Sequence, residues 1–255
     1  MKAKRWFGWS WPLLAVLVAV ALVASCTASE TGNPVAERKM TLLARSSDDA
    51  VMLLDPVVDD GVSIEQAWIV LDDIRFESGA QCDDGDENEA DIPGPIIVDL
   101  IDRPDPFELA LPDAAYCRVR VRFDRAEALP AGAPSELEDA AIVLRGTRAD
   151  GARFVIRSRR EPEAEVRSRD EPFQLTHATA SLILAFDIGR WLQGVDLEGA
   201  EPNADGVIQI DDDHDDDRLE RFETNVEAAM DLFDDHDHDG SLDDDEDDNP
   251  LASSN

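Results

Sequence analysis

The chain has 255 residues, with 58 acidic and 23 basic side chains and a formal net charge of −35. A field this negative repels nucleic acid and anionic lipid headgroups and attracts cations, so a nucleic-acid partner is excluded. The length suffices for one substantial domain with an appendage.

The N-terminus has the pattern of an export signal. Lys2, Lys4 and Arg5 are basic, and an apolar run follows from Pro12 to Ala24. At ~1.5 Å per helical residue this run is too short to cross a bilayer core of ~30 Å. We therefore expect residues 1–25 to be a signal peptide that is not part of the fold.

The signal ends in Val23-Ala24-Ser25-Cys26, which resembles the lipobox of bacterial lipoproteins. The resemblance implies cleavage before Cys26, lipid on its thiol and a stable membrane anchor in the cell envelope. Thr27, where an aspartate would retain the protein, implies the outer rather than the inner membrane. An ordinary cleaved signal with a cysteine nearby is the alternative.

The two other cysteines, Cys82 and Cys117, form an even pair. In the oxidising compartment that an export signal implies, such a pair is expected to form a disulfide. A zinc site is not expected, because no histidine is near either cysteine in the sequence.

After a polar tether, expected over 26–45, the pattern is that of β-structure to about residue 195. Cys117–Phe123 alternates strictly between apolar residues and arginines, as a half-buried strand does. Ala149-Asp150-Gly151 indicates a hairpin turn. The other apolar runs are Val51–Val58, Ala67–Phe76, Ile96–Ile101, Ala141–Gly146, Phe154–Ser158 and Ser181–Phe186. We predict a mainly β fold, an antiparallel β-sandwich of about seven strands over 46–195.

Three motifs in this region resemble a family of uncharacterised bacterial lipoproteins. They are Asp-Asp-Ile-Arg-Phe (72–76) followed by Ile-Val-Asp-Leu (97–100), Leu-Pro-Asp-Ala-Ala-Tyr (111–116) leading into a strand, and Leu-Ile-Leu-Ala-Phe-Asp (182–187). The resemblance covers roughly 45–190. It implies a prealbumin-like or carboxypeptidase-regulatory-like β-sandwich and no activity.

Residues 196–255 form an acidic tail with 24 acidic and two basic residues. Just before it, Asp187–Leu192 indicates a short helix that buries Trp191. Within the tail, an apolar stripe at i+3/i+4 spacing predicts a helix over Arg218–Phe233. Asp217 and Glu220 suggest a capping box at its start.

Residues 235–246 resemble the twelve-residue calcium loop of the EF-hand. Oxygen-bearing side chains stand at positions 1, 3, 5, 9 and 12, with Gly240 at position 6 and Leu242 at position 8. Ca²⁺ takes six to eight hard oxygen ligands, and the sharp turn at position 6 favours glycine. The predicted ligands are Asp235, Asp237, Asp239, the carbonyl of Ser241, Asp243 and Glu246.

Two features depart from a paired EF-hand. Asp247, Asp248, Asn249 and Pro250 follow position 12, so no exit helix is expected. The candidate partner loop, 201–212, ends in Asp rather than Glu and is degenerate. The alternative to a calcium site is that an acidic tail produces the loop pattern by chance. His236 and His238, at positions 2 and 4 of the loop, are expected to face solvent.

These features favour a membrane-anchored, calcium-binding and non-catalytic lipoprotein. The alternative is a carbohydrate- or protein-binding adhesin-like sandwich whose acidic tail is a solvated appendage; an exposed Trp68 would favour a sugar site. A hydrolase is disfavoured, because no nucleophile elbow, zinc-protease motif or phosphate loop occurs.

Overall fold

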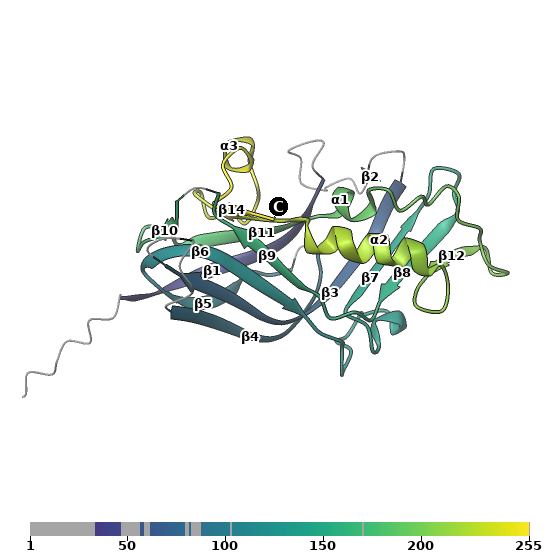
Figure 1. Cartoon of the computed structure of the whole chain (residues 1–255), viewed down its shortest axis with the longest axis horizontal. Helices are drawn as coiled ribbons and strands as arrows, with labels where there is room; N and C mark the ends of the chain where they lie inside the picture. The colour runs from purple at the N-terminus through teal and green to yellow at the C-terminus, as the bar shows by residue number, and fades with distance from the viewer. Residues whose placement is uncertain are drawn as a thin grey trace, which may run out of the picture. The chain divides into compact units, whose positions relative to one another are not determined.

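The computed structural model describes residues 34–46, 57–58, 62–79, 82, 88–102, 104–169 and 171–254. They belong to one compact unit, Asn33–Asn255 (Figure 1). The predicted signal peptide and the lipid site at Cys26 lie outside the described residues, as does most of the predicted strand 51–58.

Strands dominate the described chain, so the predicted mainly β class is confirmed. The strands are β1 (Val35–Arg45), β2 (Val57–Val58), β3 (Val62–Ser78), β4 (Asn88–Asp99), β5 (Phe107–Pro112), β6 (Ala114–Phe123), β7 (Ile142–Thr147), β8 (Arg153–Ser158), β9 (Glu163–Arg167), β10 (Phe173–Leu175), β11 (Ser181–Asp187), β12 (Val207–Ile210), β13 (Met230–Asp234) and β14 (Ala252–Ser253). The helices are η2 (Ser135–Leu137, 3₁₀), α1 (Ile188–Leu192), α2 (Asp216–Glu227) and α3 (Asp244–Asp247).

These strands form one mixed sheet in the order β12-β8-β7-β3-β6-β9-β14-β13-β11-β1-β5, with β10 on β6 and β2 and β4 on β3. Two pairs are parallel, β1 with β11 and β12 with β8. The predicted antiparallel sandwich of about seven strands is therefore not confirmed. The parallel pairs join segments far apart in the chain, which local periodicity does not reveal.

Val35–Arg45, the end of the segment expected to be a tether, forms β1 in this sheet. The charged residues in this segment interrupt the apolar alternation that marks a strand. One of them, Arg38, is nevertheless buried in the structure, with 1% of its surface exposed. The Arg38 guanidinium donates to the Asp113 carboxylate at 2.6 Å and to the carbonyls of Leu111 at 2.5 Å and Thr176 at 3.0 Å. A buried charge is tolerated here because it is paired and hydrogen-bonded.

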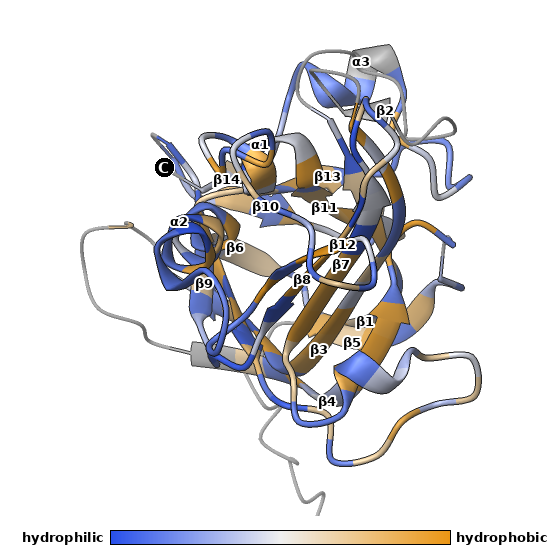
Figure 2. Ribbon diagram, turned by 90° about the vertical axis from the view of Figure 1, so that its right-hand side faces the viewer, coloured by the Kyte–Doolittle hydropathy of each residue, from blue (hydrophilic) through white to orange (hydrophobic). Residues whose placement is uncertain are grey.

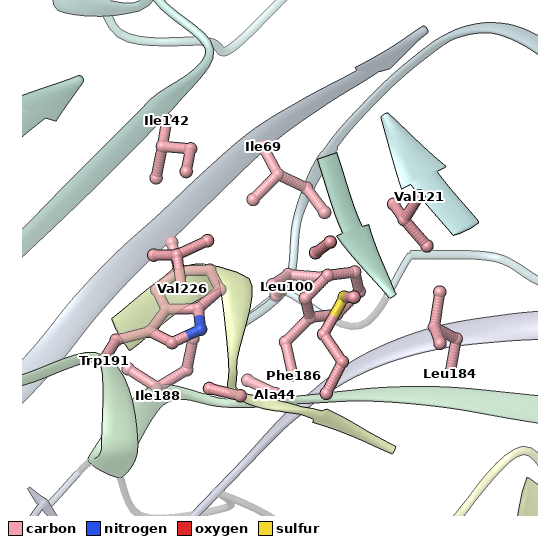
Figure 3. Packing of buried hydrophobic residues seen from close by; sticks show 14 of the residues in the cluster. Ala44, Ile69, Leu100, Val121, Ile142, Leu184, Phe186, Ile188, Trp191 and Val226 are labelled. Atoms are coloured by element: carbon pink, nitrogen blue, oxygen red, sulfur yellow. The ribbon is translucent and has the colours of Figure 1, made fainter. Parts of the chain in front are cut away.

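One apolar cluster draws residues from strands between β1 and β14 and from α1 and α2. Figure 2 shows that hydrophobic residues are concentrated in the strands of the sheet, such as β3 and β7. The rings of Phe186 and Trp191 meet edge-to-face, with a centroid distance of 6.2 Å (Figure 3). Trp191 meets Phe222 in the same way, at 5.9 Å. The three residues come from β11, α1 and α2. The short helix at Trp191 is thus confirmed, and the acidic tail supplies part of the core.

The predicted helix 218–233 is two elements. α2 ends at Glu227, and β13 pairs antiparallel with β11 from Met230 to Asp234. Met230–Phe233 is buried on both faces, and Ala229 and Phe233 continue the i+3/i+4 spacing of the helix, so periodicity alone does not separate this strand from a helix. The expected capping box is absent: the N-cap is Asp215, with no side-chain cap.

Two local predictions are confirmed. Cys82 and Cys117 form a disulfide. The Ala149–Gly151 turn joins β7 to β8, with the Arg148 N–H donating to the Ala152 carbonyl at 2.8 Å. Gly151 has φ +87°, which glycine adopts without strain.

The burial of Phe222 predicts that the acidic tail stabilises the whole fold. Phe222 is fully buried, whereas its neighbour Arg221 is exposed. We expect Phe222→Ala to lower the free energy of unfolding by about 3–5 kcal/mol and Arg221→Ala by less than about 0.5 kcal/mol. Urea unfolding followed by tryptophan fluorescence measures both. Equal, small effects would show that α2 does not pack on the core.

Tyr116, the sole tyrosine, provides a second test. It is buried against Phe76 and Phe173, and its hydroxyl donates to the Pro112 carbonyl at 2.9 Å. Burial raises its pKa from 10.0 to about 12. Because unfolding releases the phenol to its ordinary pKa, stability should fall as pH rises between these values. Ultraviolet titration should show no tyrosinate near pH 10 in the folded protein; full ionisation there would contradict this packing.

Candidate metal site

The predicted calcium loop is held in the fold at both ends. β13 delivers the chain to Asp235, whose N–H donates to the Ser181 carbonyl of β11 at 3.2 Å. After the loop, the Leu251 N–H donates to the Leu232 carbonyl at 2.7 Å, and β14 pairs with β13. Both ends of the loop are therefore fixed by the same strand.

Within the loop, side chains accept hydrogen bonds from backbone N–H groups a few residues on. The Gly240 N–H donates to Asp235 Oδ2 at 3.3 Å and the Asp239 N–H to Asp237 Oδ1 at 3.2 Å. The Ser241 N–H donates to Asp239 Oδ1 at 2.6 Å. These bonds wind the chain so that three carboxylates face one point.

Gly240 is required at its position in the turn. Its φ is +72°, which glycine adopts without strain. A Cβ there would lie 3.2 Å from the Thr41 hydroxyl of β1. The loop therefore rests closely on β1, and a larger residue would separate them.

The structure brings Asp235, Asp237 and Asp239 together, with one oxygen of each within 4.8 Å of the others. Asp237 and Asp239 are exposed, whereas Asp235 is 1% exposed. Asp235 Oδ1 is buried and has no hydrogen-bond partner among the described residues. Burial raises the pKa of the Asp235 carboxyl. The backbone hydrogen bonds that it accepts lower this pKa in part, and the negative charge of Asp237 raises it further.

Glu246, at position 12, closes the loop from the other end. It is 5% exposed; its Oε1 accepts the His236 N–H at 2.7 Å and its Oε2 the Asp243 N–H at 3.3 Å. The Asp243 carboxylate accepts the N–H of Glu246 in return, which makes a capping box for α3. The structure thus has one helical turn where the sequence predicted no exit helix.

The predicted ligands are therefore placed unequally. Asp235, Asp237 and Asp239 share one point, while the carboxylates of Asp243 and Glu246 are not within the same 4.8 Å group. Glu246 is nevertheless tied to position 2 of the loop, and each of its oxygens keeps a further lone pair for a cation. The arrangement offers only oxygen ligands.

Sequence reasoning missed the residues outside the loop that hold it. Arg45 of β1 pairs with Asp231 and with Asp247 of α3, and its guanidinium lies 5.3 Å from the centroid of the Phe233 ring. A pocket of about 180 Å³ lies between β1, residues 100–101 and 104–106, and Asp239–Gly240 of the loop. No local pattern marks these contacts, because β1 is far from the loop in the chain.

The candidate partner loop, 201–212, does not pair with the calcium loop. The Asn203 Oδ1 accepts N–H groups from Asp205 and Val207, and the next residues form β12, which pairs with β8. Within the described chain, its acidic side chains do not join a three-carboxylate group. This loop therefore leads into a strand of the sheet.

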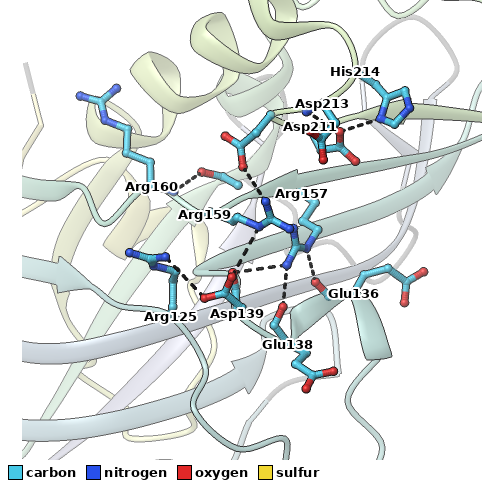
Figure 4. A network of polar contacts seen from close by, with 12 residues as sticks. Arg125, Glu136, Glu138, Asp139, Arg157, Arg159, Arg160, Asp211, Asp213 and His214 are labelled. Atoms are coloured by element: carbon cyan, nitrogen blue, oxygen red, sulfur yellow. Dashed lines mark hydrogen bonds and ion pairs between the residues drawn. The ribbon is translucent and has the colours of Figure 1, made fainter.

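A second polar region lies beside β8, where arginines meet carboxylates and backbone carbonyls (Figure 4). Arg157 donates to the carbonyls of Glu136 and Glu138 at 2.7 and 2.6 Å, and His214 contacts Asp211 at 2.8 Å. The Ser158 hydroxyl donates to Glu223 at 2.5 Å and is fully buried, so a substrate cannot reach it. The Ser158–Glu223 bond joins β8 to α2, and the Arg157 bonds join β8 to the segment around η2.

Comparison with protein families, characterised proteins and solved structures finds no match to this chain. The resemblances to a lipoprotein family and to an EF-hand loop stay predictions from the sequence. Among the helices in the described ranges, none is long and apolar enough to cross a membrane.

Proposed function

We propose that the protein is a membrane-anchored, non-catalytic lipoprotein of the cell envelope that binds Ca²⁺ at residues 235–246. The observation that carries the proposal is the buried Asp235 Oδ1, which has no hydrogen-bond partner among the described residues and whose carboxylate belongs to a group of three. Burying a carboxylate oxygen without a hydrogen-bond partner costs free energy, and a cation bound at this point would offset that cost.

The chemistry of the group favours a hard cation. Its ligands are carboxylate oxygens, with no thiol, and the two nearby histidines occupy positions 2 and 4 of the loop. Ca²⁺ accepts an irregular set of six to eight oxygens, whereas Mg²⁺ demands a near-ideal octahedron. An extracellular loop of this kind binds with Kd of roughly 10⁻⁴–10⁻³ M.

The proposal includes the predicted lipid at Cys26, with the outer membrane favoured over the inner. In this proposal, the sandwich resemblance applies to the antiparallel part of the sheet, in which β3 pairs with β4, β6 and β7. The alternative with a solvated tail does not fit, since β12, β13, β14 and α2 join the sheet and core. Trp68 is only partly exposed and packs on the cluster around Val70, so it favours no sugar site.

Calorimetric titration of the chain from residue 26 with CaCl₂ tests the site. We expect one binding event that Glu246→Gln weakens at least on the order of tenfold, because it removes the charge at position 12. Asp248→Asn, an exposed neighbour, is the matched control and should bind as the parent does. An absence of heat, or equal binding in both variants, would refute the site.

Asp235→Asn separates metal binding from simple packing. The amide keeps the shape but removes the buried charge, so we expect the metal-free variant to match or exceed the parent in thermal stability. It should lose the stabilisation that saturating Ca²⁺ gives the parent, about 2.7 kcal/mol at 100 times Kd. If the variant is less stable without Ca²⁺ and still responds to it, Asp235 is a structural residue and not a ligand.

A further inference from the structure

Leu242 is the apolar residue through which the loop packs on the sheet. It is 5% exposed and belongs to a small cluster with Leu43 of β1, Ile183 and Ala185 of β11 and Phe233 of β13. This cluster is distinct from the main core. A residue of the candidate metal loop therefore contributes to the burial of the outer face of the β1–β11 pair.

Arg45 forms a second connection on the same face of the sheet. From the end of β1 it reaches Asp231 on β13 and Asp247 on α3, one residue after Glu246. Its side chain is 16% exposed, so solvent screens the ion pairs less than at an open surface. Thr41 contributes a third contact, beneath Gly240.

These three contacts place the loop across β1 from Thr41 to Arg45, the part that extends beyond the pairing with β5. β5 pairs with β1 only from Val35 to Met40. Beyond Met40, β1 pairs with β11 up to Arg45, and the loop packs over this segment. The loop thus packs on the part of β1, Thr41–Arg45, that does not pair with β5.

We propose that Ca²⁺ acts as a clasp that joins the loop to β1 and so locks the first described strand into the sheet. The inference rests on the proposed calcium site. Without the ion, repulsion among Asp235, Asp237 and Asp239 opens the loop and withdraws Leu242 and Asp247 from β1. With the ion, the loop closes and both contacts form. β1 is the first described strand after the predicted anchor at Cys26, so the clasp would strengthen the strand that a membrane tether pulls first.

Thermodynamic linkage gives the proposal a second consequence. If Ca²⁺ strengthens the contacts to β1, then those contacts must strengthen Ca²⁺ binding by the same factor. Arg45→Gln, far from any ligand in the sequence, should therefore weaken Ca²⁺ binding. Arg153→Gln, an exposed arginine on β8, is the matched control and should leave it unchanged.

Hydrogen exchange of the chain from residue 26, measured by mass spectrometry with and without Ca²⁺, tests the clasp. Ca²⁺ should slow exchange in residues 41–45 by a factor on the order of 5 to 150, the usual range of coupling between sites. β7 lies in the sheet away from the loop and serves as the internal reference. In Leu242→Ala, Ca²⁺ should still bind in calorimetry but no longer slow exchange in β1.

The outcomes separate the two proposals. Calcium-dependent protection of β1 that Leu242→Ala abolishes supports the clasp. Binding of Ca²⁺ with unchanged exchange in β1, and with equal affinity in the Arg45 and Arg153 variants, overturns the clasp and leaves the calcium site standing. If the parent binds no Ca²⁺, both proposals fall. If Leu242→Ala does not fold, the affinities of the two arginine variants decide.

Discussion

The parallel pairing of β1 with β11 joins the first described strand to the last third of the chain. β1 connects β5 to the sheet, while β11 connects to β13 and through it to the candidate metal loop and β14. Seven residue pairs, from Lys39 with Ser181 to Arg45 with Asp187, hold this junction. Without it, β5 would lose its neighbour and the loop would lose the surface on which it rests. The candidate site is therefore a product of the sheet's topology.

Charge is distributed unevenly along this chain, and the structure uses two ways to compensate it. In the body, arginines face carboxylates across strands: the fully buried Glu77 contacts Arg118 and Arg120 of the neighbouring strand. In the tail there are only two basic residues for 24 acidic ones, so the loop cannot be neutralised in the same way. In our proposal a bound cation supplies the charge that the tail lacks, while Arg45 brings one further positive group from β1.

The acidic composition of the tail conceals its structural role. Leu219, Phe222 and Val226 of α2 are buried, whereas Asp216, Asp217 and Glu220 are exposed. Apolar periodicity identified this helix but extended it to Phe233, because Ala229 and Phe233 continue the i+3/i+4 spacing across the helix end. Composition alone indicates an appendage where the packing shows part of the core.

Elements that depend on contacts between residues close in the chain could be predicted from the sequence, whereas those that depend on distant contacts could not. Local patterns were sufficient for β6, the turn at Gly151, the helix at Trp191 and the cluster of Asp235, Asp237 and Asp239. The strand β1 was missed because the partners that compensate the charge of Arg38 are distant in the chain. The Leu111 carbonyl, the Asp113 carboxylate and the Thr176 carbonyl are 73, 75 and 138 residues away, respectively. The support of the loop by Arg45 and Leu43 was missed for the same reason.

A crystal structure with Ca²⁺ would test the central claim most directly, because it locates the ion. The account predicts an anomalous difference peak within 2.3–2.6 Å of Asp235 Oδ1, the usual Ca²⁺–oxygen distance, and of oxygens from Asp237 and Asp239, with Glu246 completing the shell. A loop without such a peak at saturating Ca²⁺, with Asp235 Oδ1 in contact only with protein or water, would contradict it.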